Sequence, residues 1–354
     1  MRHRLYRFIA LLLFVPLVAR AQTVHVGVFG IFHPQELSLS ATHSQPLVVF
    51  VGGRDLVLEP GTSGASLRIR AAGEDELLVE WQGRVLRAGE LRAKARYSAP
   101  AAFTLSVPER VTRRYSGILT IKNVGGVLVP VLSMDLETAV ASAVLAESAS
   151  GAPLEALKAQ AVVARSYYVA GGGRHENYDF CDLTHCQVLR EPPEPDSPAW
   201  RATQGTQGLV LSYEEKPVAT MFTPSCGGRT RTPSELGLPT GSYPYFAVVC
   251  DICHNHPVRW SHSVSPEDAA LLEKGEAGRL VVARRLGWTA VPSNNFSARQ
   301  ENGQVLLSGI GRGHGIGLCQ RGAVDMASHG ATFRDILNHY FPNTRISALP
   351  PPSN

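Results

Sequence analysis

The segment from Ala146 to Val169 constrains the fold most, because it contains a strongly marked helix signal. It reads AESASGAPLEALKAQAVVARSYYV. Pro153 suits the first position of a helix, where its missing N–H would be unpaired anyway, and glycines at 171–173 supply a stop. The pattern therefore predicts a helix over residues 153–170. Apolar residues at alternating spacings of three and four predict one buried face, made by Leu154, Leu157, Ala161, Ala164 and Tyr168.

Glu147 lies just ahead of this helix, near the end of an earlier predicted helix. Asp135 and Glu137 fall in the first turn of that earlier helix, where acidic groups interact favourably with the helix dipole. We interpret Glu147 as the acid/base of an enzyme. Periodicity alone, however, predicts only a core helix after it, with Lys158 and Arg165 on a solvated basic edge.

The first 21 residues have the pattern of a secretory signal peptide. MRHRLYRF is basic, IALLLFVPLV is apolar, and the small-x-small sequence ARA precedes Gln22. We therefore expect an exported protein of the periplasm or cell envelope. Arg20 is unusual inside a cleavage site, so an uncleaved anchor is the alternative. Elsewhere no apolar run approaches the roughly 18 residues of a membrane helix, so we expect no transmembrane segment in the mature chain.

Length and charge limit the remaining classes. A chain of 354 residues is long enough for about two domains. The formal net charge of +4 comes without a basic run or arm, so nucleic acid is not an expected partner. Residues 22–110 are short β-like runs broken by Gly, Pro and charged turns, which predicts a small, mostly-β N-terminal module. Packing is the favoured role of this module over binding.

Residues 111–346 mix both kinds of element and predict an α+β domain, followed by a C-terminal tail at 347–354. A hairpin is expected from GLVLSY and PVATMFT around the turn EEK, and a helix near residues 266–273. Thr332 and Asp335 match a capping box that begins a last helix, which Pro342 ends. The overall prediction is an α+β protein with a β-rich start.

His175, Cys181, His185 and Cys186 form a compact set of two histidines and two cysteines within twelve residues. Imidazole and thiolate are the ligands that a tetrahedral zinc ion prefers, so we expect zinc here. Four protein ligands would close the coordination sphere and make this zinc structural. A disulfide between Cys181 and Cys186 is the alternative, and an exported location favours it.

The other four cysteines, Cys226, Cys250, Cys253 and Cys319, include a Cys-x-x-Cys pair. They fit either a second zinc site with four cysteine ligands or two disulfides, and sequence alone allows three pairings. A redox role for the sequence CDIC is not expected, because no thioredoxin-like βαβ pattern surrounds it.

Several separated motifs occur in one order: the Glu147 helix, ALKAQAVVARSYY, CQVL, SCGGRT, GRGHGIGLCQRGA and ILNHYFPNTRI. In this order they resemble the SpoIID/LytB family, the stage II sporulation protein D and amidase-enhancer group of bacterial cell-wall proteins. The resemblance covers about residues 115–346 and implies a SpoIID-like catalytic domain. Some members carry zinc at a similar His/Cys cluster beside the catalytic helix.

Sporulation-type members of this family are peptidoglycan lytic transglycosylases, which cleave between N-acetylmuramic acid and N-acetylglucosamine and leave 1,6-anhydro ends. The resemblance implies Glu147 as the catalytic acid/base acting on peptidoglycan glycan strands. One carboxyl suffices, because it can protonate the departing oxygen and then accept a proton from the sugar's 6-hydroxyl. To act as an acid near neutrality, Glu147 needs a partly apolar setting that raises its pKa.

The resemblance also implies substrate-binding positions, which are Lys158, Gln160, Arg165, Ser225, His314 and Gln320. A solvated face, a tight turn or simple packing accounts for several of these residues as well. Two rival functions stay open. One is a non-catalytic peptidoglycan-binding protein that stimulates a cell-wall amidase, and the other is a zinc hydrolase that uses the His/Cys set.

Overall fold

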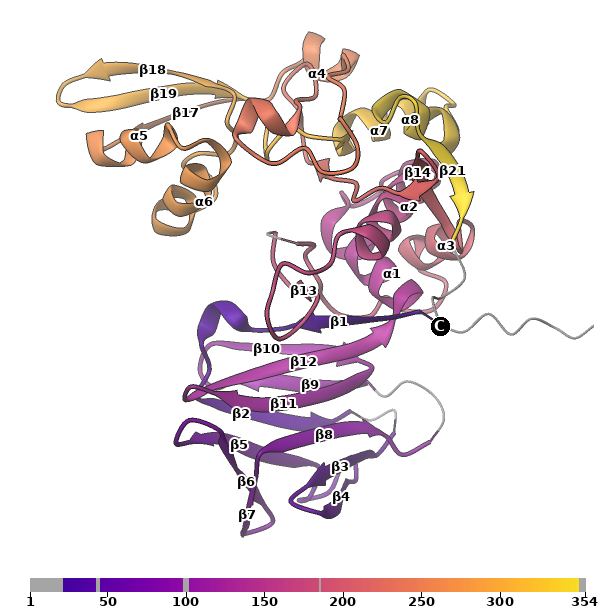
Figure 1. The fold of residues 1–354 in the computed structure, drawn as a ribbon, viewed down its shortest axis with the longest axis vertical. Coiled ribbons are helices and arrows are strands. Elements are labelled where there is room, and N and C mark those ends of the chain that lie inside the picture. Colours follow the sequence, from indigo (N-terminus) through magenta and orange to yellow (C-terminus); the bar gives the residue numbers. More distant parts are fainter. Residues whose placement is uncertain (1–21, 43–44, 98–101, 185, 350–354) are drawn as a thin grey trace, which may run out of the picture.

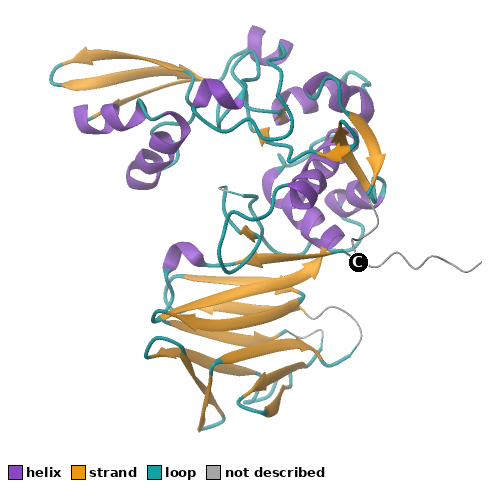
Figure 2. Cartoon of the chain, in the orientation of Figure 1, coloured by secondary structure: helices purple, strands orange, loops and turns teal. Residues whose placement is uncertain are grey.

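The computed structural model describes residues 22–349, except 43–44, 98–101 and 185. The predicted signal peptide, the predicted ligand His185 and most of the C-terminal tail lie outside these residues. Within them, a β-sandwich is followed by a group of helices and then by a loop-rich C-terminal lobe (Figures 1 and 2). No helix among the described residues combines the length and the apolar character needed to cross a membrane.

Two sheets form the sandwich, and their strands are antiparallel except for the short parallel pair β1 and β13. The seven-stranded sheet has the order β13 (Phe180–Cys181), β1 (Thr23–Gly27), β12 (Val127–Asp135), β11 (Ile118–Val124), β8 (Glu90–Ala95), β3 (Leu47–Val51) and β4 (Arg54–Leu58). The six-stranded sheet has the order β10 (Val111–Ser116), β9 (Ala102–Val107), β2 (Glu36–Ala41), β5 (Ser66–Ala72), β6 (Glu76–Trp81) and β7 (Arg84–Ala88). A short 3-10 turn, η1 (Gly30–Phe32), follows β1.

Alternating side chains explain why these segments form a sandwich. In β2, Leu37 and Leu39 are fully buried while the serines between and beyond them are partly exposed, and β3 buries Leu47 and Val49 in the same way. Successive residues of a strand point to opposite faces, so one face of each sheet joins a shared apolar core. The predicted β-rich N-terminal module is therefore present.

The sandwich extends beyond the boundary that the sequence predicts at residue 110. Strands β10, β11 and β12 carry it to Asp135, and β12 pairs with β1 over five residues from Thr23 to Gly27. The order of segments along the chain suggests that a new domain starts after residue 110, because it does not reveal which strands pair. Strand β10 pairs with β9 in the second sheet, while β11 pairs with β8 and β12 with β1 in the first, so the run is an integral part of the sandwich.

Two consecutive helices leave the sandwich at its edge. Helix α1 (Leu136–Glu147) is capped by Asp135, which the sequence places in the first turn. The Asp135 carboxylate accepts hydrogen bonds from the backbone N–H groups of Glu137 and Thr138. Helix α2 (Leu154–Ala170) follows the short turn after Glu147 and confirms the helix predicted over 153–170. Helix α3 (Pro198–Gln204) packs against both.

Helix α2 is buried on two faces, which differs from the single apolar face that the periodicity predicts. Leu157, Ala161, Ala164 and Tyr168 join the core of the sandwich. Ala156, Ala159, Val162 and Val163 join the core of the C-terminal lobe on the opposite side. A helix enclosed between two cores has no solvated basic edge, and this decides the environment of Arg165.

The C-terminal lobe contains short elements joined by long loops (Figure 2). They are β14 (Leu209–Tyr213), β15 (Lys216–Pro217), β16 (Phe222–Thr223), η2 (Pro233–Leu236), α4 (Asp251–Asn255), β20 (Leu318–Cys319), α7 (Gln320–Ser328), α8 (Phe333–Tyr340) and β21 (Arg345–Ala348). A projecting unit is inserted within the lobe (Figure 1), and it contains β17 (Arg259–Val264), α5 (Pro266–Leu272), α6 (Gly275–Leu286), β18 (Phe296–Glu301) and β19 (Gln304–Ile310).

The predicted helices of the lobe are confirmed where residues close together in the sequence determine where a helix begins. The helix predicted near 266–273 is α5, and the Thr332–Asp335 capping box is present at the start of α8. The predicted hairpin is shorter than expected, because its second strand ends at Pro217. The chain then packs onto α2, where the Thr220 hydroxyl donates a hydrogen bond to the Val163 carbonyl at 2.7 Å.

Candidate functional site

Glu147 is the last residue of α1, and the structure leaves it partly exposed between the sandwich and the C-terminal lobe. The helix stops there because Ser148 adopts an extended conformation, while its N–H still bonds to the Val144 carbonyl. One carboxylate oxygen of Glu147 accepts a hydrogen bond of 2.8 Å from the backbone N–H of Val188. The carboxyl group is thus fixed by the backbone on one side.

The surroundings make Glu147 a weaker acid than a free glutamate. Burial raises its pKa, and this effect exceeds the opposing effects of the Val188 hydrogen bond and the positive charge of Arg190. A carboxyl group in this setting keeps its proton to a higher pH than it does in water. Glu147 therefore has the character expected of a general acid.

Two glutamine side chains lie next to Glu147 and come from elements far apart in the sequence. The Gln320 amide, at the start of α7, donates to the Glu147 backbone carbonyl at 2.9 Å and approaches the Gln160 side-chain oxygen at 3.4 Å. Gln160, on α2, is only 3% exposed, and its amide nitrogen has no acceptor among the described residues. Thus α1, α2 and α7 bring together three of the residues that the sequence predicts for the site.

The His/Cys cluster, defined here as His175, Cys181 and Cys186, also forms in the structure. Its ligand atoms all lie within 4.8 Å of one another, and the His175 Nε2 atom is 3.4 Å from the Cys186 sulfur. In a tetrahedral zinc site, bond lengths of about 2.0 Å to nitrogen and 2.3 Å to sulfur place two such ligands about 3.5 Å apart. A hydrogen bond with Cys181 lowers the pKa of the Cys186 thiol to about 6, which favours the thiolate that binds metal.

This donor set fits zinc, and the cluster is linked directly to Glu147. Cys181 lies in β13, which is held by parallel pairing with β1. Gln187, next to Cys186, is 1% exposed and donates to the Ala164 carbonyl on α2 at 3.0 Å. The following residue, Val188, supplies the N–H that Glu147 accepts. A ligand that holds the cluster in place therefore also holds the Val188 N–H, which donates to the Glu147 carboxylate.

Arg165 does not belong to the site, and its predicted role in binding substrate is wrong. Its side chain is 0% exposed and forms two hydrogen bonds of 2.9 and 2.6 Å with the Glu137 carboxylate. Its remaining donors bond to the carbonyls of Leu209 and Thr203. Because α2 is enclosed on two faces, Arg165 joins α1, α2 and β14 and cannot reach a ligand.

Ser225 is also removed from the predicted set. It is 4% exposed, and its hydroxyl lies 3.4 Å from the Cys253 sulfur. Burial keeps this hydroxyl from contacting a polymer such as a glycan.

Lys158 and His314 have other partners than the predicted substrate. The Lys158 ammonium pairs with Glu155 at 2.7 Å and lies over the Phe333 ring. His314 accepts a hydrogen bond from the Ile316 N–H at 3.0 Å, and burial lowers its pKa to about 4. His314 is therefore neutral at pH 7, and its charged neighbours are Glu276 and Arg279 of the inserted unit.

Sequence reasoning missed Val188 and Arg190. Val188 acts through its backbone N–H, which leaves no trace in the residue type, and Arg190 acts through its charge at a distance. Neither contact has a short-range signal, because each joins residues more than 40 positions apart in the chain. The signal that comes nearest is the motif CQVL, which contains Val188.

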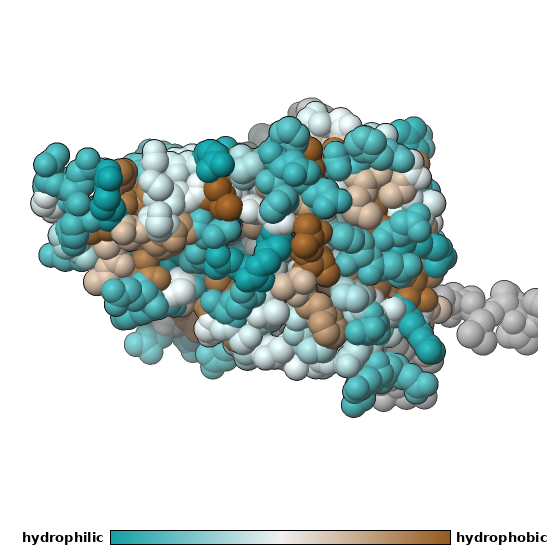
Figure 3. Space-filling model, turned by 90° about the horizontal axis from the view of Figure 1, so that it is seen from above, coloured by the Kyte–Doolittle hydropathy of each residue, from teal (hydrophilic) through white to brown (hydrophobic). Residues whose placement is uncertain are grey.

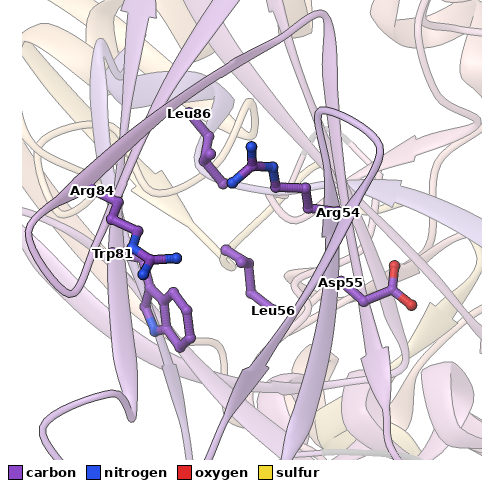
Figure 4. Close-up of a pocket in the computed structure, with 6 residues that line it drawn as sticks. All are labelled: Arg54, Asp55, Leu56, Trp81, Arg84 and Leu86. Carbon is purple, nitrogen blue, oxygen red and sulfur yellow. The ribbon is translucent and has the colours of Figure 1, made fainter.

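Two cavities lie elsewhere on the sandwich. One of 380 Å³ opens at β4, β6 and β7, where Arg54, Arg84 and Trp81 line it (Figure 4). The other, of 490 Å³, lies between the β11–β12 face and the loop that carries His175 and Tyr178. Apart from His175, neither is lined by a residue predicted for the site.

We expect Glu147→Gln to stabilise the folded protein at neutral pH. The pKa of Glu147 is raised above its ordinary 4.5, so ionisation above pH 4.5 costs folding free energy that an uncharged amide does not lose. The gain should be present at pH 7 and should vanish below pH 4.5, where the carboxyl is protonated in both the folded and the unfolded chain. Thermal unfolding at several pH values measures it. A variant less stable than wild type at pH 7 contradicts this account.

Parts of this chain are similar to known proteins. A family model described as Stage II sporulation protein, SpoIID, matches residues 125–213. An uncharacterized protein of Brachyspira hyodysenteriae is 26% identical over 266 residues, which cover 64% of this chain and 70% of the relative. A stage II sporulation protein D of Bacillus amyloliquefaciens is 26% identical over 244 residues, covering 54% of this chain and 68% of the relative.

A shorter similarity involves an amidase enhancer of Bacillus subtilis. It is 33% identical over 63 residues, which cover 18% of this chain and 9% of that protein. This match is confined to one segment and leaves most of the relative without a counterpart here.

Proposed function

We propose that this chain is a catalytic member of the SpoIID/LytB family with a role connected with the cell wall. In this proposal it is a lytic transglycosylase that cleaves the bond from N-acetylmuramic acid to N-acetylglucosamine in peptidoglycan glycan strands. Glu147 is the acid/base. The observation that carries the proposal is a partly exposed carboxyl group with a raised pKa, held at one oxygen by the Val188 N–H.

The reaction needs one carboxyl group used twice. Glu147, protonated, gives its proton to the glycosidic oxygen as the bond from that oxygen to C1 of the muramic acid breaks. The 6-hydroxyl of the same sugar then attacks C1, and its proton passes to the Glu147 carboxylate. The new O6–C1 bond closes the 1,6-anhydro ring, and Glu147 regains its starting state without consuming water.

The glutamines support this chemistry by position. Gln320 ties the end of α1 to α7 through the Glu147 carbonyl. Gln160 is positioned beside it by the same side chain, since the Gln320 amide lies 3.4 Å from the Gln160 side-chain oxygen.

We further propose that His175, Cys181 and Cys186 hold a zinc ion, with His185 as the fourth ligand. Four protein ligands would close the coordination sphere, so the ion would supply structure and take no part in bond cleavage. Its role would be to hold the loop that ends at Val188, and thereby to keep the N–H of that residue against Glu147. We also propose that the protein is exported to the periplasm or cell envelope.

A second candidate function is a non-catalytic protein that binds peptidoglycan and stimulates a cell-wall amidase. The similarity to a protein named amidase enhancer favours it. This candidate needs the same fold and a similar glycan contact, but it does not need a protonated Glu147.

Product analysis separates the two candidates. Purified full-length protein would be incubated with intact peptidoglycan and with glycan strands stripped of stem peptides, and the products analysed by mass spectrometry. We expect new 1,6-anhydro ends on at least one of the two polymers. Binding to both polymers without new anhydro ends, together with faster release of stem peptides by an added amidase, would favour the second candidate.

A further inference from the structure

Four cysteines from three separate segments meet in the core of the C-terminal lobe. Cys226 follows β16, Cys250 and Cys253 lie at the start of α4, and Cys319 ends β20 just before α7. They are 3%, 2%, 0% and 0% exposed, in that order, and their sulfur atoms all lie within 4.8 Å of one another. We call this group the four-cysteine cluster.

We propose that the four-cysteine cluster binds a zinc ion through four thiolates, and that this ion holds Gln320 beside Glu147. The sulfur atoms of Cys253 and Cys319 are 3.6 Å apart. In a tetrahedral site with bonds of about 2.3 Å to sulfur, neighbouring sulfurs lie about 3.8 Å apart. Mutual spacing of all four sulfurs around one point is the arrangement that a single ion requires, whereas two disulfides would join the sulfurs in pairs.

Hydrogen-bond donors surround the sulfurs, as expected for metal-bound thiolates. The Cys226 N–H donates to the Cys319 sulfur at 3.4 Å, and the Tyr340 hydroxyl donates to the Cys250 sulfur at 3.3 Å. The Ser225 hydroxyl lies 3.4 Å from the Cys253 sulfur. Such outer contacts stabilise the negative charge on the sulfur and orient it towards the ion. They also give buried Ser225 a role other than substrate binding.

Neighbouring glycines leave the space that the cluster needs. A Cβ atom at position 322 would lie 2.6 Å from the Cys250 sulfur and would also collide with the Tyr340 hydroxyl. Gly227 and Gly228, just after Cys226, have φ angles of +79° and +125°, which side chains other than glycine rarely adopt. These glycines let three chain segments approach one point.

The surrounding chain has little regular structure to hold it. Between β15 and β17 it contains a two-residue strand, one 3-10 turn and the five-residue helix α4, linked by loops (Figure 2). A closed four-ligand ion contributes folding free energy directly and suits such a segment. The face over this lobe carries mainly hydrophilic residues with small, separate apolar patches (Figure 3). The four cysteines are buried in the apolar core of the lobe.

The cluster is connected to the candidate site through one peptide bond. Cys319 is followed by Gln320, whose amide contacts the Glu147 carbonyl and the Gln160 side chain. An ion that fixes Cys319 therefore fixes the start of α7 and the position of Gln320. The proposal that the cluster binds zinc is argued from the four cysteines alone. Only the expected effect of the ion on catalysis depends on the proposed function.

Zinc content and thiol content test this proposal without an activity assay. The full chain would be purified without added metal or metal-affinity resin, as wild type, as Cys181→Ser/Cys186→Ser, and as the same double variant with Cys253→Ser. Because the double variant removes the other cluster, any zinc that it keeps belongs to the four cysteines. We expect one zinc per chain in the double variant and none in the triple variant.

A second measurement keeps the result decisive if the triple variant does not fold. Denatured in a chelator without reductant, the double variant should show four titratable thiols. Amide hydrogen exchange at residues 319–322 should become faster in the folded double variant after its zinc is removed. No zinc in the double variant, iron in its place, or fewer than four thiols would overturn the proposal.

Discussion

Glu147→Gln is expected to slow the release of 1,6-anhydro ends by about 10²–10⁴-fold, the usual contribution of a general acid/base. Glutamine keeps the shape of the side chain, and its oxygen can still accept the hydrogen bond from Val188. It has no proton to give to the departing oxygen and cannot take one from the 6-hydroxyl. Initial rates of anhydro-end formation, measured by mass spectrometry on saturating glycan, check this result.

A matched control uses the same substitution at an exposed carboxylate. Glu191 has a side chain that is 56% exposed and pairs only loosely with Arg114, at 3.7 Å. Glu191→Gln should therefore change the rate less than twofold, while glycan binding should persist in both variants. An unchanged rate for Glu147→Gln would remove Glu147 from the acid/base role. Loss of binding and rate together would mean that Glu147 holds the sugar without transferring a proton.

Arg165→Met is expected to lower the free energy of unfolding by about 3 kcal/mol, near the lower end of the range for a broken buried ion pair. The substitution leaves the Glu137 carboxylate without its two charge-assisted hydrogen bonds and removes one hydrogen-bond donor from each of the Leu209 and Thr203 carbonyls. The lower end applies because the Glu137 side chain is 18% exposed and partly hydrated. Denaturant unfolding measures the loss.

The control for this prediction is an ion pair of similar length at the surface. Arg96 and Glu59 approach to 2.7 Å, but each side chain is 45% exposed. Arg96→Met should cost less than about 1 kcal/mol, because water screens an exposed pair. If both variants lose equal stability, burial is not what makes Arg165 important. If Arg165→Met retains wild-type stability and weakens glycan binding instead, the structural role assigned to Arg165 is wrong.

The two predictions separate chemistry from architecture within one pair of helices. Glu147 ends α1 at a partly exposed position, and its loss should reduce the rate while raising stability at neutral pH. Arg165 lies inside α2, and its loss should reduce stability first. A catalytic carboxyl group often lowers the stability of the folded protein, because its ionised form is less favourable in a buried position than in water.

Sequence alone determined the features that depend on neighbouring residues. Pro153 and the glycines after residue 170 set the limits of α2, Asp135 caps α1, and Thr332 with Asp335 begins α8. These signals are local because hydrogen bonds at the end of a helix involve residues within one turn. The family resemblance placed Glu147, Gln160 and Gln320 in the site, and the structure brings these three together.

Tertiary structure alone decided what each side chain faces. The helix pattern puts Arg165 on a solvated edge, but packing between two cores encloses it with Glu137. Ser225 turns to the Cys253 sulfur, and the first sheet reaches Asp135 because β12 pairs with β1 across more than one hundred residues. Contacts at such separations depend on how whole elements pack, and the residues near a position in the chain carry no signal of them.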